Sequence, residues 1–250
     1  MASPRCLLWA SVLLLSGCDT LFPEFGGSKP PDAAVARDGG VSDDGGTPML
    51  AGVVCVLGDV RDYRTCLTGA PGILRITVEE TRQQTMTDAA GRFVLPLSMK
   101  IDVATVAAVD PSGHFAPTIV PVHLAGGVAN NVALPVVAAQ TISSIELANG
   151  VNDDPQRGTF IGWAVDPTGT PVAGVSSGQS SALYDDNAAN TLSAGTATHQ
   201  RGAVALFVVT PTTLTLTLTP PPTVALSGDT FTIPIRPGAV TATTLVLPPR

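Results

Sequence analysis

The segment LRITVE at residues 74–79 decides the fold, because apolar and polar side chains alternate along it without a break. Successive side chains of an extended chain point to opposite faces, so Leu74, Ile76 and Val78 share one face. A period of two predicts a β-strand with one buried side. Residues 93–95, FVL, follow a turn-forming stretch and predict the next strand.

Outward from this segment, short apolar runs recur at a spacing typical of all-β domains. They cover residues 101–109, 116–124 and 130–138, and Leu and Thr alternate over residues 213–219. No helical period lies between them, and 22 Pro and 25 Gly scattered through the chain interrupt long helices. The sequence therefore predicts an all-β protein of two small antiparallel β-sandwiches rather than a parallel sheet with crossover helices.

Composition and charge exclude one class of partner. Hydrophobic residues make up 44%, aromatic residues 4% and charged residues 13%, so the apolar mass is mostly Val, Leu, Ala and Ile. The net charge is −7 and the 13 basic residues are dispersed, whereas nucleic-acid binding needs clustered Lys and Arg with aromatic neighbours. We expect no nucleic-acid partner.

Residues 1–17 have the zones of an export signal peptide. A short region with Arg5 precedes the apolar run from Leu7 to Leu15, and Leu-Ser-Gly-Cys ends at Cys18. The run is shorter than the roughly 20 apolar residues that a membrane-spanning helix needs. Its ending resembles the lipobox of bacterial lipoproteins, which implies that Cys18 is acylated, becomes the mature N-terminus and anchors the protein to a membrane of the cell envelope. Ordinary secretion with a coincidental Cys is the alternative.

Residues 18–49 read as a flexible acidic linker. Gly, Pro, Ser and Asp dominate and no apolar period survives, so the segment buries too little surface to offset its ordering entropy. We expect a tether with a reach of about 30 Å. A calcium loop is the sharper alternative, although the D-x-D-x-D-G spacing of an EF-hand is missing.

Two cysteines remain for the body of the exported chain. Cys6 leaves with the signal peptide and Cys18 carries the lipid, so Cys55 and Cys66 form the one remaining pair. An oxidising compartment makes a disulfide between them the expected state. A metal site is the rival, but two thiols with no nearby His are too few ligands. The bridge would staple residues 56–65, which have little apolar content.

A short frame, T-x-x-x-G-x-φ-x-L, occurs twice in the body of the chain. Thr87 and Gly91 begin the first copy, and Thr198 and Gly202 begin the second. Both glycines fit turn positions that favour positive φ. The sequence thus indicates an internal duplication.

Together with GWAVDPTGTPVAGV at residues 162–175, the frame resembles the carboxypeptidase regulatory-like family. Its members are small transthyretin-like β-sandwiches with the motif order G-x-V-x-D, G-x-P-V-x-G-V and T-D-x-x-G-x-F. The first copy matches best at the last motif and carries a Cys-bounded insertion, and the second matches best at the middle motif. The resemblance implies two β-sandwich domains, at residues 50–139 and 140–250.

One motif points to catalysis. GVSSG at residues 174–178 fits G-x-S-x-G, the strand-to-helix elbow that exposes a nucleophilic serine, here Ser176. The elbow needs a helix after it and then an acid and a histidine, but a Ser/Gly-rich stretch follows and His199 is the only later histidine. We expect a loop, and a serine hydrolase using Ser176 is the alternative.

The remaining candidates are a metal site and a sugar platform. His114, His123 and His199 lack the H-E-x-x-H spacing of zinc peptidases, and residues 184–187, YDDN, read as a polar turn rather than a cation site. Trp163 and the tyrosine of that turn would suit a carbohydrate-binding module, although isolated aromatic residues more often belong to a core. We expect no metal and no cofactor.

These observations favour a non-enzymatic, lipid-anchored envelope protein that displays two β-sandwich modules for interaction or scaffolding. Its expected partners are the membrane and an envelope protein or polysaccharide. A serine hydrolase and a carbohydrate-binding module are the alternatives that the geometry tests.

Overall fold

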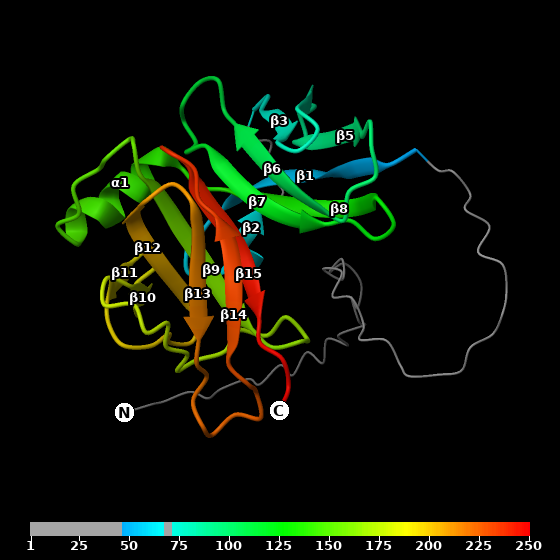
Figure 1. Cartoon of the computed structure of the whole chain (residues 1–250). Coiled ribbons are helices and arrows are strands. Elements are labelled where there is room, and N and C mark those ends of the chain that lie inside the picture. The colour runs from blue at the N-terminus through cyan, green and yellow to red at the C-terminus, as the bar shows by residue number, and fades with distance from the viewer. Residues whose placement is uncertain (1–46, 68–71) are drawn as a thin grey trace, which may run out of the picture.

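Strands dominate residues 47–67 and 72–250, the part of the chain that this computed structural model describes, and one α-helix accompanies them there (Figure 1). This confirms the prediction of an all-β fold. No helix in those ranges is long and apolar enough to cross a membrane. The predicted signal peptide, Cys18 and the tether as far as residue 46 lie outside the described residues.

The first half of the chain forms a sandwich of two sheets. In one sheet, β1 pairs with β8 along one edge and with β5 and β2 along the other. In the second, β6 lies between β3 and β7, and β4 pairs with β3. The strands are β1 (Met49–Leu57), β2 (Cys66–Leu67), β3 (Arg75–Val78), β4 (Gln83–Met86), β5 (Arg92–Pro96), β6 (Val103–Val109), β7 (Thr118–His123) and β8 (Val128–Val136).

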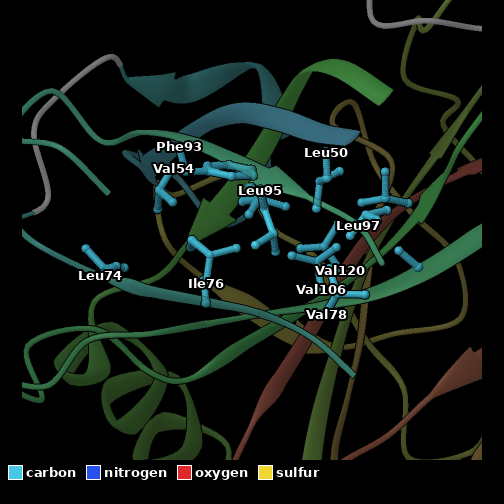
Figure 2. Packing of buried hydrophobic residues seen from close by; sticks show 14 of the residues in the cluster. Leu50, Val54, Leu74, Ile76, Val78, Phe93, Leu95, Leu97, Val106 and Val120 are labelled. Carbon is cyan, nitrogen blue, oxygen red and sulfur yellow. The ribbon is translucent and has the colours of Figure 1, made fainter. Parts of the chain in front are cut away.

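The face that the alternating pattern assigned to the interior is the core of this sandwich. Leu74, Ile76 and Val78 have no exposed surface, and they pack with Leu50 and Leu95 of the facing sheet (Figure 2). Burying each such side chain contributes about 1.5–3 kcal/mol. All members of this core lie between residues 50 and 136, so the first half buries a core of its own.

The second half forms another sandwich. β9 lies between β12 and β15, β10 pairs with β12 and β11, and the hairpin of β13 and β14 covers one face. Leu216 and Leu218 of the Leu/Thr alternation are fully buried in this core, as the pattern predicted. The strands are β9 (Gly158–Val165), β10 (Leu183–Asp185), β11 (Leu192–Ala194), β12 (Ala203–Val209), β13 (Thr213–Leu218), β14 (Asp229–Pro234) and β15 (Val240–Val246).

One sheet runs through both halves. Its strand order is β11-β10-β12-β9-β15-β7-β6-β3-β4, and β15 pairs in parallel with β7 as well as with β9. The parallel pair β1·β8 adds a third exception to the expected antiparallel arrangement. The prediction of antiparallel sandwiches is corrected in this respect, because the last strand of each half returns to the edge of the first strand and runs in the same direction.

The strand pairing of the two halves repeats. β1 has an antiparallel partner, β5, and a parallel partner, β8, while β9 has β12 and β15 in the same roles. Gly52 stands opposite Phe93, and Gly162 stands opposite Val204 at the equivalent register. The structure thus supports the internal duplication that the T-x-x-x-G frame indicates.

The threonine of the frame has the same structural role in both copies. The hydroxyl of Thr87 accepts the backbone N–H of Leu74 at 3.0 Å, and that of Thr198 accepts the N–H of Val175 at 3.0 Å. Each hydroxyl also donates to a backbone carbonyl, and both threonines are buried. The first frame therefore joins the residue before β3 to the loop before β5, and the second joins Val175, in the segment between β9 and β10, to the loop before β12.

A third hydrophobic core joins the halves. The outer face of β9, which points away from its own sandwich core, is covered by Leu57 and Val60 from the first half. Ile142 and Ile145 of the helix α1 (Ala139–Ala148) cover the same face, so every residue of β9 is buried. The predicted domain boundary at residues 139/140 falls at the start of this helix. Independent folding of the two halves stays a prediction.

Candidate functional site

The structure brings Cys55 and Cys66 to disulfide distance, with their Cα atoms 5.2 Å apart. This supports the predicted bridge. Residues 58–65 between them, which we name the junction loop, contain a short 3₁₀ turn, η1 (Tyr63–Thr65). The junction loop extends from the first sandwich onto the outer face of β9, so the bridge closes a loop that both halves use.

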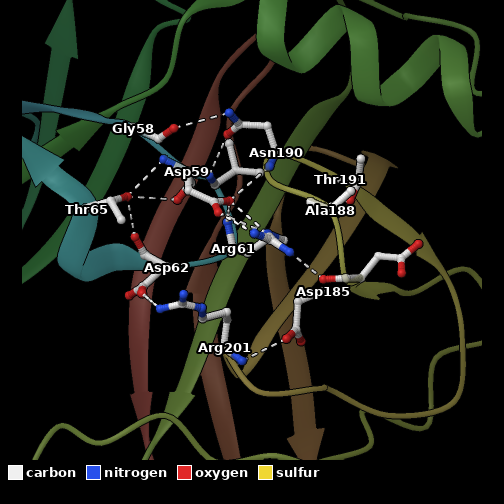
Figure 3. Close-up of polar contacts among 12 residues, drawn as sticks. Gly58, Asp59, Arg61, Asp62, Thr65, Asp185, Ala188, Asn190, Thr191 and Arg201 are labelled. Atoms are coloured by element: carbon white, nitrogen blue, oxygen red, sulfur yellow. Dashed lines mark hydrogen bonds and ion pairs between the residues drawn. The ribbon is translucent and has the colours of Figure 1, made fainter. Parts of the chain in front are cut away.

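Asp59 and Arg61 form the centre of the polar contacts between this loop and the second half (Figure 3). The Arg61 guanidinium donates to both carboxylate oxygens of Asp59, with an Nη2–Oδ2 distance of 2.6 Å, and its Nη1 donates to the carbonyl oxygen of Asp186. The backbone N–H of Asn190 donates to Asp59 at 3.1 Å, and the Asn190 side chain bonds two backbone groups of the loop. The turn between β10 and β11 is thereby fastened to the first half.

Asp62 makes the second set of contacts. Its carboxylate accepts hydrogen bonds from Arg64 Nε at 2.8 Å and Nη2 at 2.9 Å, and it is paired with Arg201 from the second half. Behind it, the Asp185 carboxylate accepts the backbone N–H of Arg201 at 2.8 Å. We name the residues that link the halves in this way the polar clamp: Asp59, Arg61, Asp62, Asn190 and Arg201.

The clamp lowers the pKa of both of its carboxyl groups. Burial acts to raise the pKa of Asp59, but hydrogen bonds from Arg61 and from the backbone of Asn190 favour the charged form and bring the pKa below its ordinary value. Burial also acts to raise the pKa of Asp62, and the hydrogen bonds and charge of Arg64 with the charge of Arg201 lower it. Both carboxylates are therefore ionised at neutral pH.

The two aromatic residues of the sugar-platform alternative are buried. Trp163 is 1% exposed, and its Nε1 donates to the carbonyl oxygen of Val60 at 3.0 Å, with the Tyr63 ring 6.1 Å away between centroids. Tyr184 is 3% exposed, and its hydroxyl accepts the backbone N–H of Ser177. The sugar-platform alternative is wrong, because neither ring is accessible to a carbohydrate; both rings are part of cores.

Ser176 does not lie in a nucleophile elbow. Its backbone exchanges hydrogen bonds with Thr219 at 3.0 and 2.8 Å, and its Oγ lies 3.5 Å from the carbonyl oxygen of the same residue. The next regular element is strand β10 and not a helix. Within the described ranges the Ser176 hydroxyl makes no hydrogen bond to a histidine or an acid. The segment matches the G-x-S-x-G sequence pattern but does not have the geometry of a nucleophile elbow.

The predicted polar residues outside the cores have ordinary structural roles. His114, His123 and His199 are exposed, and His114 Nδ1 lies 2.7 Å from the Ser112 hydroxyl. The predicted polar turn at residues 184–187 is wrong for its first two residues, which belong to strand β10. The buried Asp185 carboxylate accepts the backbone N–H groups of His199 and Arg201 in the loop before β12. Over residues 47–67 and 72–250, no group of three or more His, Cys, Asp or Glu is arranged to hold a metal ion.

The sequence predicted the disulfide bridge but not the polar clamp. The run DVRDYR at residues 59–64 alternates acids with arginines, and this alone would have indicated local ion pairs. Its link to Asn190 spans 131 residues of sequence, for which no local pattern exists. Trp163 was the other sequence feature that could have indicated a contact between the halves, since a single buried indole needs an acceptor for its N–H.

Comparison with known proteins gives no family. No protein-family model matches the chain, and no curated protein matches it. Among solved structures it is similar to the Bacillus anthracis TIE protein (12% identity, TM-score 0.27, 81% of this chain and 34% of that one). It is also similar to the shaft pilin SpaA from Lactobacillus rhamnosus GG (14% identity, TM-score 0.25, 82% of this chain and 98% of that one). A third similar structure is GBS52, the minor pilin of Streptococcus agalactiae (13% identity, TM-score 0.24, 81% of this chain and 96% of that one). The chain spans about a third of the Bacillus protein. TM-scores this low carry no argument about function.

Proposed function

We propose that the chain is a lipid-anchored protein of the bacterial cell envelope that displays a non-catalytic double β-sandwich for interaction or scaffolding. The observation that carries this proposal is the junction. A shared sheet, a third core and the polar clamp fix the second sandwich on the first. Such a rigid body suits a module that presents a surface at the end of a tether.

The anchor rests on the sequence ending Leu-Ser-Gly-Cys at Cys18. Two or more acyl chains give stable membrane attachment, where a single chain is marginal. We expect Cys18→Ser to move the protein from the membrane pellet to the soluble exported fraction and to remove the acyl mass. Cys6→Ser is the matched control, since it removes a cysteine of the signal peptide and leaves the lipobox intact. Unchanged partitioning of Cys18→Ser, with no acyl mass on the wild type, would refute the anchor.

The non-catalytic part of the proposal is tested separately. Purified protein is assayed against a panel of esterase and peptidase substrates, with Ser176→Ala beside the wild type. We expect no turnover by either. Hydrolysis by the wild type that Ser176→Ala abolishes would overturn the proposal in favour of a serine hydrolase. Crosslinking in intact cells followed by capture then identifies the envelope protein or polysaccharide that the module contacts.

A further inference from the structure

A cavity of about 270 Å³ lies where the end of β6, the helix α1 and the starts of β9 and β15 meet. Its walls are partly apolar, with Phe115, Ile142 and Val240 among the lining residues. Four carboxylates and a single arginine also line it: Asp110, Glu146, Asp153, Asp154 and Arg157. The lining therefore combines apolar side chains with an excess of negative charge, which favours a ligand that has both an apolar part and a positive charge.

Glu146 is the unusual member of this lining. It is 7% exposed, and its carboxylate makes no hydrogen bond or ion pair with any described residue. Burial, and then the negative charge of Asp153, raise its pKa. Glu146 also lies in the last turn of α1, which contains no basic residue, so the negative end of the helix dipole adds to the unfavourable potential. Its oxygen atoms still reach solvent, because no fully buried side-chain oxygen of the described residues lacks a hydrogen-bond partner.

The other charged groups of the cavity are already engaged. The Asp110 carboxylate accepts the backbone N–H groups of Ser112, His114 and Phe115 and the Ser112 hydroxyl. Arg157 lies 3.7 Å from Asp154 and donates to the hydroxyl of Thr210. The arginine therefore does not neutralise Glu146 or Asp153, and these two carboxylates remain open to an external cation.

We propose that this cavity binds a primary ammonium group on an aliphatic stem, with Glu146 and Asp153 as its carboxylate partners. The apolar walls suit methylene groups, as they do for the stem of a lysine side chain. A metal ion is disfavoured, because the described residues contain no group of three or more ligating side chains. The ammonium group can come from a free diamine or from a lysine of a partner protein. The proposal does not depend on acylation of Cys18.

Calorimetric titration of the full-length protein tests the charge selectivity. The probes are 1,5-diaminopentane and, as controls with the same stem, 1-pentanol and pentanoate. We expect the diamine to bind at least tenfold more tightly than either control. Equal binding of pentanol, or no binding of any amine, would overturn the proposal. Lysine blocked as an acetyl methylamide identifies the source, because its binding supports a partner's side chain and binding of the diamine alone supports a free amine.

Substitution locates the site. Glu146→Gln keeps the shape and removes the charge, so we expect at least a tenfold loss of affinity together with a higher melting temperature of the empty protein. Asp102→Asn is the matched control, since this exposed residue precedes β6 at the end opposite Asp110 and makes the same change in net charge. Wild-type affinity in Glu146→Gln would refute the site. Asp153→Asn, at an exposed position, repeats the test if Glu146→Gln does not fold.

Discussion

Replacing Cys55 and Cys66 with Ala removes the bridge that closes the junction loop. The two cysteines are 11 residues apart in sequence, and chain entropy assigns a loop of this size about 3 kcal/mol of stabilisation. For a chain of this length, that loss corresponds to a fall in Tm of about 6–12 °C. Because the loop packs on β9 and carries Asp59, Arg61 and Asp62 of the clamp, we expect both sandwiches to weaken and not only the first.

Denaturant unfolding followed by two probes measures this effect. The chain has two tryptophans: Trp9 belongs to the predicted signal peptide, and Trp163 lies in the second half against the carbonyl oxygen of Val60. Its fluorescence therefore reports the junction, while circular dichroism reports the strands of both halves. In the double variant we expect both transitions to move together to lower denaturant concentration.

Chemical reduction of the wild type separates the bridge from the packing of the cysteine side chains. Reduction should reproduce most of the loss and should leave the double variant unchanged. A Trp163 transition of the variant that coincides with that of the wild type, while only the first half loses stability, would refute a role of the bridge in both halves. A total change in the free energy of unfolding below about 0.5 kcal/mol, the level of an ordinary surface substitution, would refute it equally.

Three further predictions concern the frame, the sheet and the clamp. Thr198→Val leaves the N–H of Val175 without its acceptor and should cost about 1–3 kcal/mol, while Thr244→Val at an exposed position of β15 should cost less than about 0.5 kcal/mol in the same thermal melts. Gly52→Ala places a Cβ 2.0 Å from the carbonyl oxygen of Val132, so a lower yield of folded protein and a reduced Tm are expected, and an unchanged Tm would count against the β1·β8 register. The pKa of Asp59 is lowered by folding, so its stabilisation is complete above the ordinary aspartate pKa and is lost as the pH falls through the folded value; Asp59→Asn should flatten this acid-side loss of Tm.

Local periodicity predicted the parts of the fold that depend on local chemistry. LRITVE became β3 with its three apolar residues buried, and the two T-x-x-x-G frames became equivalent buried threonines, because a strand face and a turn hydrogen bond are properties of a few neighbouring residues. The disulfide followed from counting cysteines. These features needed no knowledge of the partner strands.

The features that the sequence missed are set by distant partners. The parallel pairing of β15 with β7 and β9 depends on strand order, which a period of two does not encode. The helix α1 has no side-chain N-cap and contains β-branched residues, so it depends on packing Ile142 and Ile145 against β9. Glu146, on the same helix, reads as a solvent-exposed residue until the cavity is seen.

Separate expression of residues 50–139 and 140–250 is the most direct test of the claim that two duplicated sandwiches pack together as one structural unit. Each half contains a complete core, so we predict that each gives a β-type circular dichroism spectrum and a cooperative melt. Each should melt below the intact chain, because cutting the chain exposes the third core and breaks the clamp. A half that is unfolded or helical would contradict the account, and so would an intact chain that melts in two steps at the temperatures of its isolated halves.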